Sequence, residues 1–250
     1  MTTDPMTIFL DIYNELPRQG PGSPQATRQA LAHCSPLADD ATIADIGCGP
    51  GMQTITLVEN TSANIIGVDF HAQYLAQLDA RAHTLGLQNR ITTTQADMNH
   101  LPFAPQSLDL IWSEGAVYII GVSDALTTWK PFLKPAGIVA FTEIAWIKDN
   151  PPTPIRDYWT ENYSQMASTD EKLAEIQAAG YDPVAHFALS AGDWWTHYYA
   201  PLEARLPTMS EKYATSPLGQ SIIAETRREL SMHRQYSEYY SYVFFVCQAR

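Results

Sequence analysis

The sequence predicts an α/β protein with a doubly wound, mostly parallel sheet of seven strands and a helical cap inserted before the last strand. From residue 42 onward, short apolar runs alternate with helical patterns, which is typical of parallel strands joined by right-handed crossovers. A glycine-rich turn at residues 47–51 follows the first of these runs. A long segment, residues 191–240, precedes the last apolar run, and segments of this length are seldom structureless in compact domains. A chain of 250 residues suits one domain, so we expect residues 1–250 to form a single domain.

Residues 1–24 predict an N-terminal arm that ends in a loop. Apolar side chains at helical spacing precede Pro17, which stops the pattern: Ile8, Phe9, Ile12, Tyr13 and Leu16. The following stretch, R-Q-G-P-G-S-P at residues 18–24, is rich in turn residues. Its glycines and prolines flank two polar side chains, Arg18 and Gln19. We therefore expect the arm to fold over a ligand site as a lid.

The remaining elements follow from periodicity and from turn residues. Helices are expected where apolar residues recur at helical spacing, at 25–33, 53–59, 72–85, 125–133 and 170–179. Strands are expected at short apolar runs bounded by turns, at 42–46, 64–68, 91–95, 108–112, 138–144, 183–189 and 242–247. The K-P-A-G stretch at 134–137 predicts a turn, and N-P-P-T-P at 150–154 is incompatible with regular structure. The aromatic-rich segment 191–240 predicts a helical substrate cap.

Composition argues against several kinds of partner. The formal charge of −12, from 15 basic and 27 acidic residues without a basic run, would repel nucleic acid. No apolar run reaches the roughly 20 residues needed to span a bilayer, and no basic leader is visible. We therefore expect a cytoplasmic protein without a nucleic-acid or membrane partner. Cys34, Cys48 and Cys247 have no metal-binding spacing, so no metal site is expected. The oligomeric state stays open, a homo-oligomer included.

The strongest chemical signal is D-I-G-C-G-P-G at residues 45–51, between a predicted strand and a predicted helix. Its glycines let the backbone turn sharply, so that a ligand can lie against the main chain. The dinucleotide pattern G-x-G-x-x-G is absent, because Met52 occupies the sixth position counted from Gly47. Asp45 would also repel a phosphate, whereas it suits a cationic amine. These features disfavour the alternative of a nicotinamide-dependent oxidoreductase.

Two more acids follow the next two predicted strands. Asp69 follows the second strand, where a carboxylate can accept hydrogen bonds from both hydroxyls of a ribose. Asp97 follows the third strand and could accept from an exocyclic adenine amine, with the Met98 main-chain N–H donating to the ring. Together with Asp45, these acids predict a phosphate-free nucleoside along one edge of the sheet.

With these motifs the chain resembles class I S-adenosylmethionine (SAM)-dependent methyltransferases of the small-molecule type, and over its length it is similar to uncharacterised bacterial members. The matching segments are residues 43–51, 65–70, 96–102, 108–115 and 133–137. The resemblance implies a Rossmann-like methyltransferase fold, SAM as cofactor, and methyl transfer to a small molecule by direct displacement at the sulfonium. Pro50 is a mild departure from the family pattern. The expected cofactor-binding residues are Asp45, Gly47, Cys48, Gly49, Gly51, Asp69, Phe70, Asp97, Met98, Glu114, Arg18 and Gln19.

The sequence leaves the catalytic group and the acceptor atom open. A D/N-P-P-Y/F pattern, which marks amino methyltransferases of nucleic acid and protein, is absent after the fourth strand. Candidate bases are Glu114, Tyr118, Glu143 and His197. Candidate acceptor-binding residues are Tyr13, Tyr118, Trp146, Trp194, Trp195 and His197, although core packing also explains the aromatic ones. Because no base is certain, a non-catalytic SAM-binding protein remains the alternative.

Overall fold

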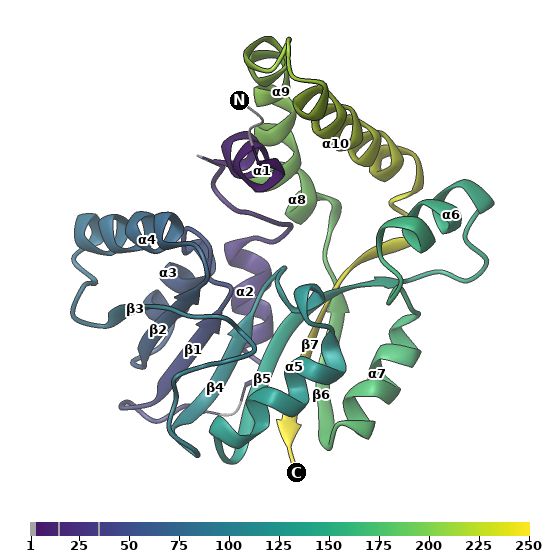
Figure 1. The fold of residues 1–250 in the computed structure, drawn as a ribbon. Helices are drawn as coiled ribbons and strands as arrows, with labels where there is room; N and C mark the ends of the chain where they lie inside the picture. The colour runs from purple at the N-terminus through teal and green to yellow at the C-terminus, as the bar shows by residue number, and fades with distance from the viewer. Residues whose placement is uncertain (1–3, 15, 35) are drawn as a thin grey trace.

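The computed structural model describes residues 4–14, 16–34 and 36–250, so residues 1–3 and 15 of the expected arm lie outside it. A seven-stranded sheet runs through the molecule in the order β3-β2-β1-β4-β5-β7-β6 (Figure 1). Strands β1 to β5 are parallel, and β7 lies antiparallel between β5 and β6. The strands are β1 Thr42–Ile46, β2 Asn64–Asp69, β3 Ile91–Gln95, β4 Leu108–Ser113, β5 Leu133–Trp146, β6 Tyr181–Ala188 and β7 Tyr240–Ala249. The predicted doubly wound, mostly parallel sheet is confirmed.

Helices cover both faces of this sheet and its carboxyl edge (Figure 1). They are α1 Pro5–Tyr13, α2 Pro24–Leu31, α3 Met52–Glu59, α4 Ala72–Leu85, α5 Val122–Trp129, α6 Thr153–Asn162, α7 Thr169–Ala178, α8 Ala191–Trp194, α9 Ala200–Lys212 and α10 Pro217–Tyr236. Single turns of 3₁₀-helix form η1 Val117–Ile119 and η2 Lys130–Phe132, and η3 Trp195–Tyr199 is a π-helical turn.

Successive strand residues face opposite sides of the sheet, and each side has its own core. Ile43 of β1 joins a core with residues of α2, α3, α4 and the cap, whereas Ala44 joins a core with residues of α5 and α7. The strand order reverses between β1 and β4, and ligands of doubly wound sheets bind outside the carboxyl ends of the strands at such a point.

The helices α8 to α10, which we call the cap, form a layer above the carboxyl edge of the sheet together with α1 (Figure 1). The arm is fastened to the cap by polar contacts. Asp11 accepts a hydrogen bond from the Tyr213 hydroxyl at 2.7 Å and pairs with Lys212 at 2.6 Å. Arg205 donates from Nε to the carbonyl of Ile12 at 3.0 Å. The helices α1 and α9, which are far apart in the sequence, therefore meet over the carboxyl edge of the sheet (Figure 1).

The structure corrects some expected element ends. The helix expected at 125–133 is α5, which ends at Trp129, because Pro131 lacks an N–H donor and the chain continues as η2. The expected turn at 134–137 lies inside β5 as an irregularity, with Ala136 at φ +60°. The expectation of no regular structure at 150–154 fails at its end, because α6 begins at Thr153 with a proline in its first turn, where no N–H partner is lost.

Within the ranges that the structure describes, none of the helices combines the length and the apolarity that crossing a membrane requires.

Candidate functional site

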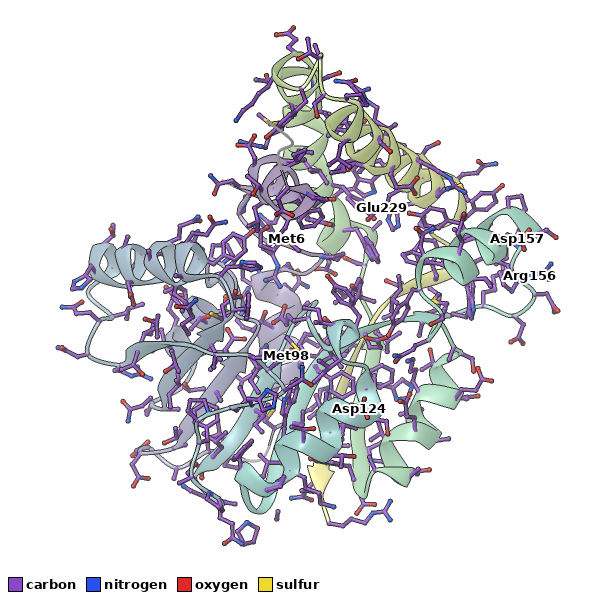
Figure 2. The ribbon with its side chains drawn as sticks, viewed as in Figure 1. Met6, Met98, Asp124, Arg156, Asp157 and Glu229 are labelled. Carbon is purple, nitrogen blue, oxygen red and sulfur yellow. The ribbon has the colours of Figure 1, made fainter. Side chains whose placement is uncertain are left out.

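A cavity of about 470 Å³ lies at the switch point of the sheet. Its walls come from α1 and the loop after it, from the β1–α3 turn, from the ends of β2 and β3, and from the segment between β4 and η1. Met6 of α1 and Met98 after β3 both line it and are labelled in Figure 2, Met6 at the arm and Met98 nearer the sheet. The volume falls in the range of small-molecule sites, about 300–1,000 Å³.

The glycine turn forms the floor of this cavity. Gly47 and Gly49 have φ values of +71° and +52°, which glycine adopts without strain. A Cβ on Gly47 would lie 2.4 Å from the Cβ of Ala116, so only glycine lets this turn approach the segment before η1. A Cβ on Gly49 would meet only the Gln19 side chain, at 3.5 Å or more. Cys48 and Gly51 belong to the same turn, although Cys48 also lines the cavity and Gly51 does not.

Asp69 lies at the end of β2 and lines the cavity with both carboxylate oxygens held in place. Oδ2 accepts from the Gly49 N–H at 2.9 Å, and Oδ1 accepts from the His71 N–H at 2.8 Å. Burial raises the pKa of this carboxyl, against these hydrogen bonds. Each oxygen keeps a further lone pair, so the group can accept two more hydrogen bonds from a diol.

The wall after β2 and β3 is more open. Phe70 is 65% exposed, and it lines the cavity with Asp97 and Met98. Asp97 accepts from the Asn99 N–H at 2.8 Å, and this hydrogen bond lowers the pKa of its carboxyl. The Met98 carbonyl accepts from the Trp129 indole at 2.9 Å, which fixes the backbone of this turn. A flat apolar group could lie between the Phe70 and Met98 side chains, next to the Asp97 carboxylate as a hydrogen-bond acceptor.

A buried ion pair closes the opposite wall. Arg18 donates from Nη2 to Glu114 Oε2 at 2.6 Å, and both side chains are buried and line the cavity. Glu114 Oε1 accepts from Thr27 at 2.7 Å and from Trp112 at 2.8 Å. Glu114 thus holds Arg18 in place with both oxygens occupied. The Arg18 Nη1 is buried without a hydrogen-bond partner in the described part of the chain.

Gln19 joins the arm to α4, next to the cavity wall formed by Arg18 and Glu114. Its Oε1 accepts from the Tyr74 hydroxyl of α4 at 2.8 Å, and its Nε2 donates to the Tyr13 carbonyl at 3.1 Å. The side chain bridges α1 and α4 across the cavity that it lines.

Asp45 lies behind the glycine turn and does not line the cavity. Its fully buried carboxylate accepts from Thr54 at 2.5 Å and from Gln53 at 3.5 Å, both in α3. Burial raises its pKa to about 7. In this position Asp45 fixes the start of α3, and its partner Gln53 lines the cavity.

The candidate bases occupy different surroundings. Tyr118 of η1 lines the cavity and is 44% exposed, whereas His197 of η3 does not line it. Glu143 is buried in β5, where Oε1 accepts from the Tyr163 hydroxyl at 2.5 Å and Lys172 lies 3.5 Å away. Burial raises the pKa of Glu143 to about 7, against the effect of Lys172. The Tyr163 ring meets the Tyr118 ring edge-on at 6.4 Å, which links Glu143 to the cavity wall.

Most of the expected acceptor residues lie in the aromatic core between the cap and the sheet. Tyr13 and Trp194 are buried, and Trp194 stacks on His233 at 4.3 Å. Trp195 lies under the Arg234 guanidinium at 4.5 Å, and Trp146 meets Tyr240 at 6.3 Å. Of the expected acceptor-binding residues, Tyr118 is the one found among the described residues that line the cavity.

Other lining residues were absent from the expected set. Among them are apolar side chains of α1 and polar or aromatic side chains after β2: Met6, Phe9, Leu10, His71 and Tyr74. Phe9 belongs to the helical stripe of the arm that the sequence displays, so the expected lid already indicated it. Groups of three or more His, Cys, Asp or Glu side chains suited to a metal do not occur among the described residues.

Comparisons with known proteins agree with this geometry. Residues 43–137 match the model of a family described as a methyltransferase domain. A sterol 24-C-methyltransferase of Gibberella zeae is 27% identical over 183 residues, covering 70% of this chain and 48% of the relative. A demethylmenaquinone methyltransferase of Lactobacillus johnsonii is 30% identical over 145 residues, covering 57% of this chain and 58% of the relative. The chain therefore spans about half the length of these curated relatives.

A solved structure has the same fold over its whole length. It is a SAM-dependent methyltransferase from Geobacter sulfurreducens in complex with S-adenosyl-L-homocysteine (SAH), with a TM-score of 0.82, 23% identity and 100% of both chains covered. At this identity the likeness shows the fold. The predicted family resemblance and fold class are confirmed by these matches.

Proposed function

We propose that this chain, which carries a methyltransferase domain at residues 43–137, is a SAM-dependent methyltransferase that acts on a small molecule. The observation that carries the proposal is one cavity lined together by the glycine turn, by Asp69 and by the buried guanidinium of Arg18. SAM is a nucleoside joined to a zwitterionic amino acid, and it carries no phosphate.

The residues present fit such a group at each of its ends. The buried Nη1 of Arg18 has no hydrogen-bond partner among the described residues, and a carboxylate such as that of the methionine end would supply one. Asp69 has lone pairs left for the two ribose hydroxyls. Phe70, Asp97 and Met98 offer apolar faces and an acceptor for an adenine. Of the other expected cofactor residues, Gly47, Cys48, Gly49, Glu114 and Gln19 line the same cavity, whereas Asp45 and Gly51 do not.

Bound SAM supplies a methyl group on a positively charged sulfur, which the acceptor displaces directly. The protein's main contribution is to hold the acceptor in line and to keep water out, and positioning of this kind is worth on the order of 7–11 kcal/mol. We propose that α1 acts as the lid, because Met6, Phe9 and Leu10 line the cavity from above. A base is required only for an acceptor that must lose a proton.

We propose that Tyr118 is the candidate base that lies nearest to such an acceptor. Glu143 lies farther from the cavity, on the other side of Tyr163. The Tyr163 hydroxyl already donates to Glu143, and burial holds the pKa of Glu143 at about 7. This carboxyl could take up a proton near neutral pH. We propose Glu143 as a positioning residue that acts through Tyr163, and Glu114 as the residue that positions Arg18.

The first test is calorimetric titration of the purified protein with SAM, SAH and NADH. We expect SAM and SAH to bind at one site and NADH to give no saturable heat. NADH binding without SAH binding would contradict the proposal. The second test incubates the protein with a metabolite extract and methyl-labelled SAM, followed by mass identification of the product. A labelled small molecule supports an enzyme, whereas SAH binding without any labelled product supports a non-catalytic SAM-binding protein.

The setting of the reaction is part of the same proposal. We propose a cytoplasmic enzyme with a small-molecule acceptor and without a nucleic-acid partner, because a net charge of −12 repels polyanions. Size-exclusion chromatography with light scattering would measure whether it forms a homo-oligomer.

A further inference from the structure

One carboxylate of the cap faces inward without a cationic partner. Glu229 lies on α10, whose neighbouring residues Thr226, Leu230 and His233 are buried, and Figure 2 places it on the underside of that helix. Its Oε1 accepts from the Tyr199 hydroxyl at 2.7 Å. No Lys or Arg among the described residues forms an ion pair with it.

The adjacent charges of α10 do not compensate Glu229. Arg228 pairs with Glu225 at 3.5 Å and with Glu161 of α6 at 3.6 Å, on the exposed side of the helix. Burial raises the pKa of Glu229, against the Tyr199 hydrogen bond. A half-buried carboxylate of this kind is costly while it stays unpaired, and a cation beside it would remove that cost.

Tyr199 contacts Glu229 directly, and other tyrosines lie near enough to be affected by its charge. Seven tyrosines have a pKa raised first by burial and also by the negative charge of Glu229, so all seven lie within its electrostatic reach: Tyr13, Tyr118, Tyr158, Tyr198, Tyr199, Tyr240 and Tyr242. They come from α1, η1, α6, η3 and β7. Aromatic faces around a carboxylate attract organic cations through both charge and ring quadrupoles.

This environment continues to the cofactor cavity by two routes. Tyr118 lines the cavity and is also one of the seven tyrosines. Phe9 lines the cavity and stacks on Tyr13 at 4.2 Å, and Tyr13 lies 6.3 Å from Tyr198. Tyr198 in turn stacks on Tyr199 at 4.9 Å, whose hydroxyl donates to Glu229. A row of rings therefore joins the proposed methyl donor site to the uncompensated carboxylate.

We propose that Glu229 and the tyrosines around it bind an ammonium group of the methyl acceptor, so that the substrate class is a small organic cation. This inference rests on the proposed function, because it assigns the acceptor side of the same site. Glu229 forms an ion pair with the ammonium group, and Tyr118 and Tyr242, whose side chains are not fully buried, pack against the rest of the acceptor. The net charge of −12 attracts cations to the protein. The atom that receives the methyl group lies elsewhere on the acceptor, toward Tyr118.

The test uses three probes of nearly equal shape and different charge: phenethylammonium, 2-phenylethanol and phenylacetate. Each is titrated into SAH-saturated protein at neutral pH, with tryptophan fluorescence and calorimetry as readouts. We expect phenethylammonium to bind at least about tenfold more tightly than the alcohol, and phenylacetate to bind most weakly. Equal binding of the three probes, or preference for the anion, would overturn the inference.

A matched pair of variants locates the effect. Glu229→Gln keeps an oxygen for the Tyr199 hydroxyl and removes the charge, so the preference for phenethylammonium over 2-phenylethanol should fall to near one. Glu225→Gln changes an exposed carboxylate one turn earlier and should keep the preference. A preference that persists in Glu229→Gln would overturn the inference, and the probe comparison on the unaltered protein remains decisive if that variant does not fold. SAH affinity is measured first, so loss of SAH binding would contradict the proposed function, whereas SAH binding without amine preference would contradict this inference alone.

Discussion

The ion pair of Arg18 and Glu114 has a structural role and a proposed binding role, and mutations can separate the two. Glu114 is satisfied by Arg18, Thr27 and Trp112, so its charge is compensated inside the protein. Among the described residues, one buried nitrogen of Arg18 has no hydrogen-bond partner, and Arg18 is the one arginine or lysine among the described residues that line the cavity. The guanidinium is therefore both a structural cation and the proposed anchor for a carboxylate.

Replacing Arg18 by Met should weaken both stability and SAM binding. The remaining buried Glu114 would cost about 3 kcal/mol in the free energy of unfolding, which urea titration measures. SAH affinity should fall at least about tenfold in calorimetry, because a bidentate or charge-assisted contact is lost. The double variant Arg18→Met with Glu114→Gln should regain most of the stability and none of the affinity. Recovery of both would mean that Arg18 acts only as a structural cation.

Replacing Asp69 by Asn should weaken nucleoside binding by roughly tenfold to a hundredfold. The amide has one oxygen instead of two, so it cannot serve the Gly49 N–H, the His71 N–H and a diol together. Comparing adenosine with 2′,3′-dideoxyadenosine by calorimetry separates the ribose contact from a distorted turn. We expect the preference for adenosine to vanish in the variant and to persist in Asp79→Asn, a change at a carboxylate of α4 that bonds Thr93. An unchanged preference in Asp69→Asn would contradict the ribose assignment.

The sequence predicts these residues with uneven success, for a physical reason. Asp69 and the glycines follow strand ends, where position in the chain alone places them at the switch point. Asp45 lies one residue before the end of β1, on the same face as Ile43, and its side chain therefore points under α3 to Thr54. Arg18 and Gln19 were expected in the site only through the turn-rich loop, and their contacts with Glu114 and Tyr74 depend on how distant segments meet.

At the scale of elements, α1 is attached to the cap, whereas the loop that follows it is attached to the sheet and its helices. Asp11 on α1 contacts Lys212 and Tyr213, both at the end of α9. On the sheet side, Gln19 holds the loop after α1 through Tyr74. A lid that is attached to the cap at one end and to α4 at the other can open only if one of these two attachments breaks.

Replacing Asp11 by Ala should therefore speed ligand release with little loss of stability. Asp11 is half-exposed, and its contacts with Lys212 and Tyr213 are each worth about 1 kcal/mol or less at such a position. We expect the dissociation rate of SAH to rise several-fold in stopped-flow fluorescence, with the melting temperature changed by only a few degrees. Exposed Glu211→Ala on α9 is the matched control. Unchanged dissociation in Asp11→Ala would show that α1 does not gate the cavity.

The spacing of apolar residues predicts a helix or strand well where one of its faces is buried, and poorly where few of its residues are buried. The strands and the α3 and α4 helices were expected because apolar runs and helical stripes are unambiguous there. The helix α6 was missed because only Ile155 and Tyr158 are buried along it and prolines precede it. In the cap, the sequence indicates helices and aromatic packing, but it does not reveal that Glu229 points inward among tyrosines on one face of α10.

At the scale of the whole molecule, the cap and the sheet are joined by an aromatic core that contains His233. The imidazole is 1% exposed, and rings of Trp194, Tyr199 and Tyr240 lie 4.3, 5.1 and 5.6 Å from it. Neither ring nitrogen has a hydrogen-bond partner among the described residues. Burial lowers the pKa of His233 to about 4 from 6.5, so the folded protein favours the neutral imidazole.

The contribution of His233 to the free energy of unfolding should therefore fall as the pH is lowered from about 6.5 to about 4. In this window the unfolded chain binds a proton at residue 233 that the folded chain does not, so the free energy of unfolding rises with pH. The shift from 6.5 to about 4 corresponds to about 3 kcal/mol. Asp45 and Glu143 act with the opposite sign, because burial raises the pKa of each to about 7 and their stabilising protonated forms are lost as the pH rises through that value.

Replacing His233 by Phe isolates the histidine from these opposing carboxyls. Phe has a similar ring, suits the aromatic surroundings and does not titrate. The difference in unfolding free energy between this variant and the unaltered protein, measured in urea at pH 4 to pH 7.5, should grow toward acid by about 3 kcal/mol in favour of the variant. The exposed His83→Phe in α4 is the matched control, measured over the same pH range. If this difference in unfolding free energy does not change with pH, the pKa of His233 is not lowered in the folded protein. The imidazole would then be hydrated, and water would reach the junction between the cap and the sheet.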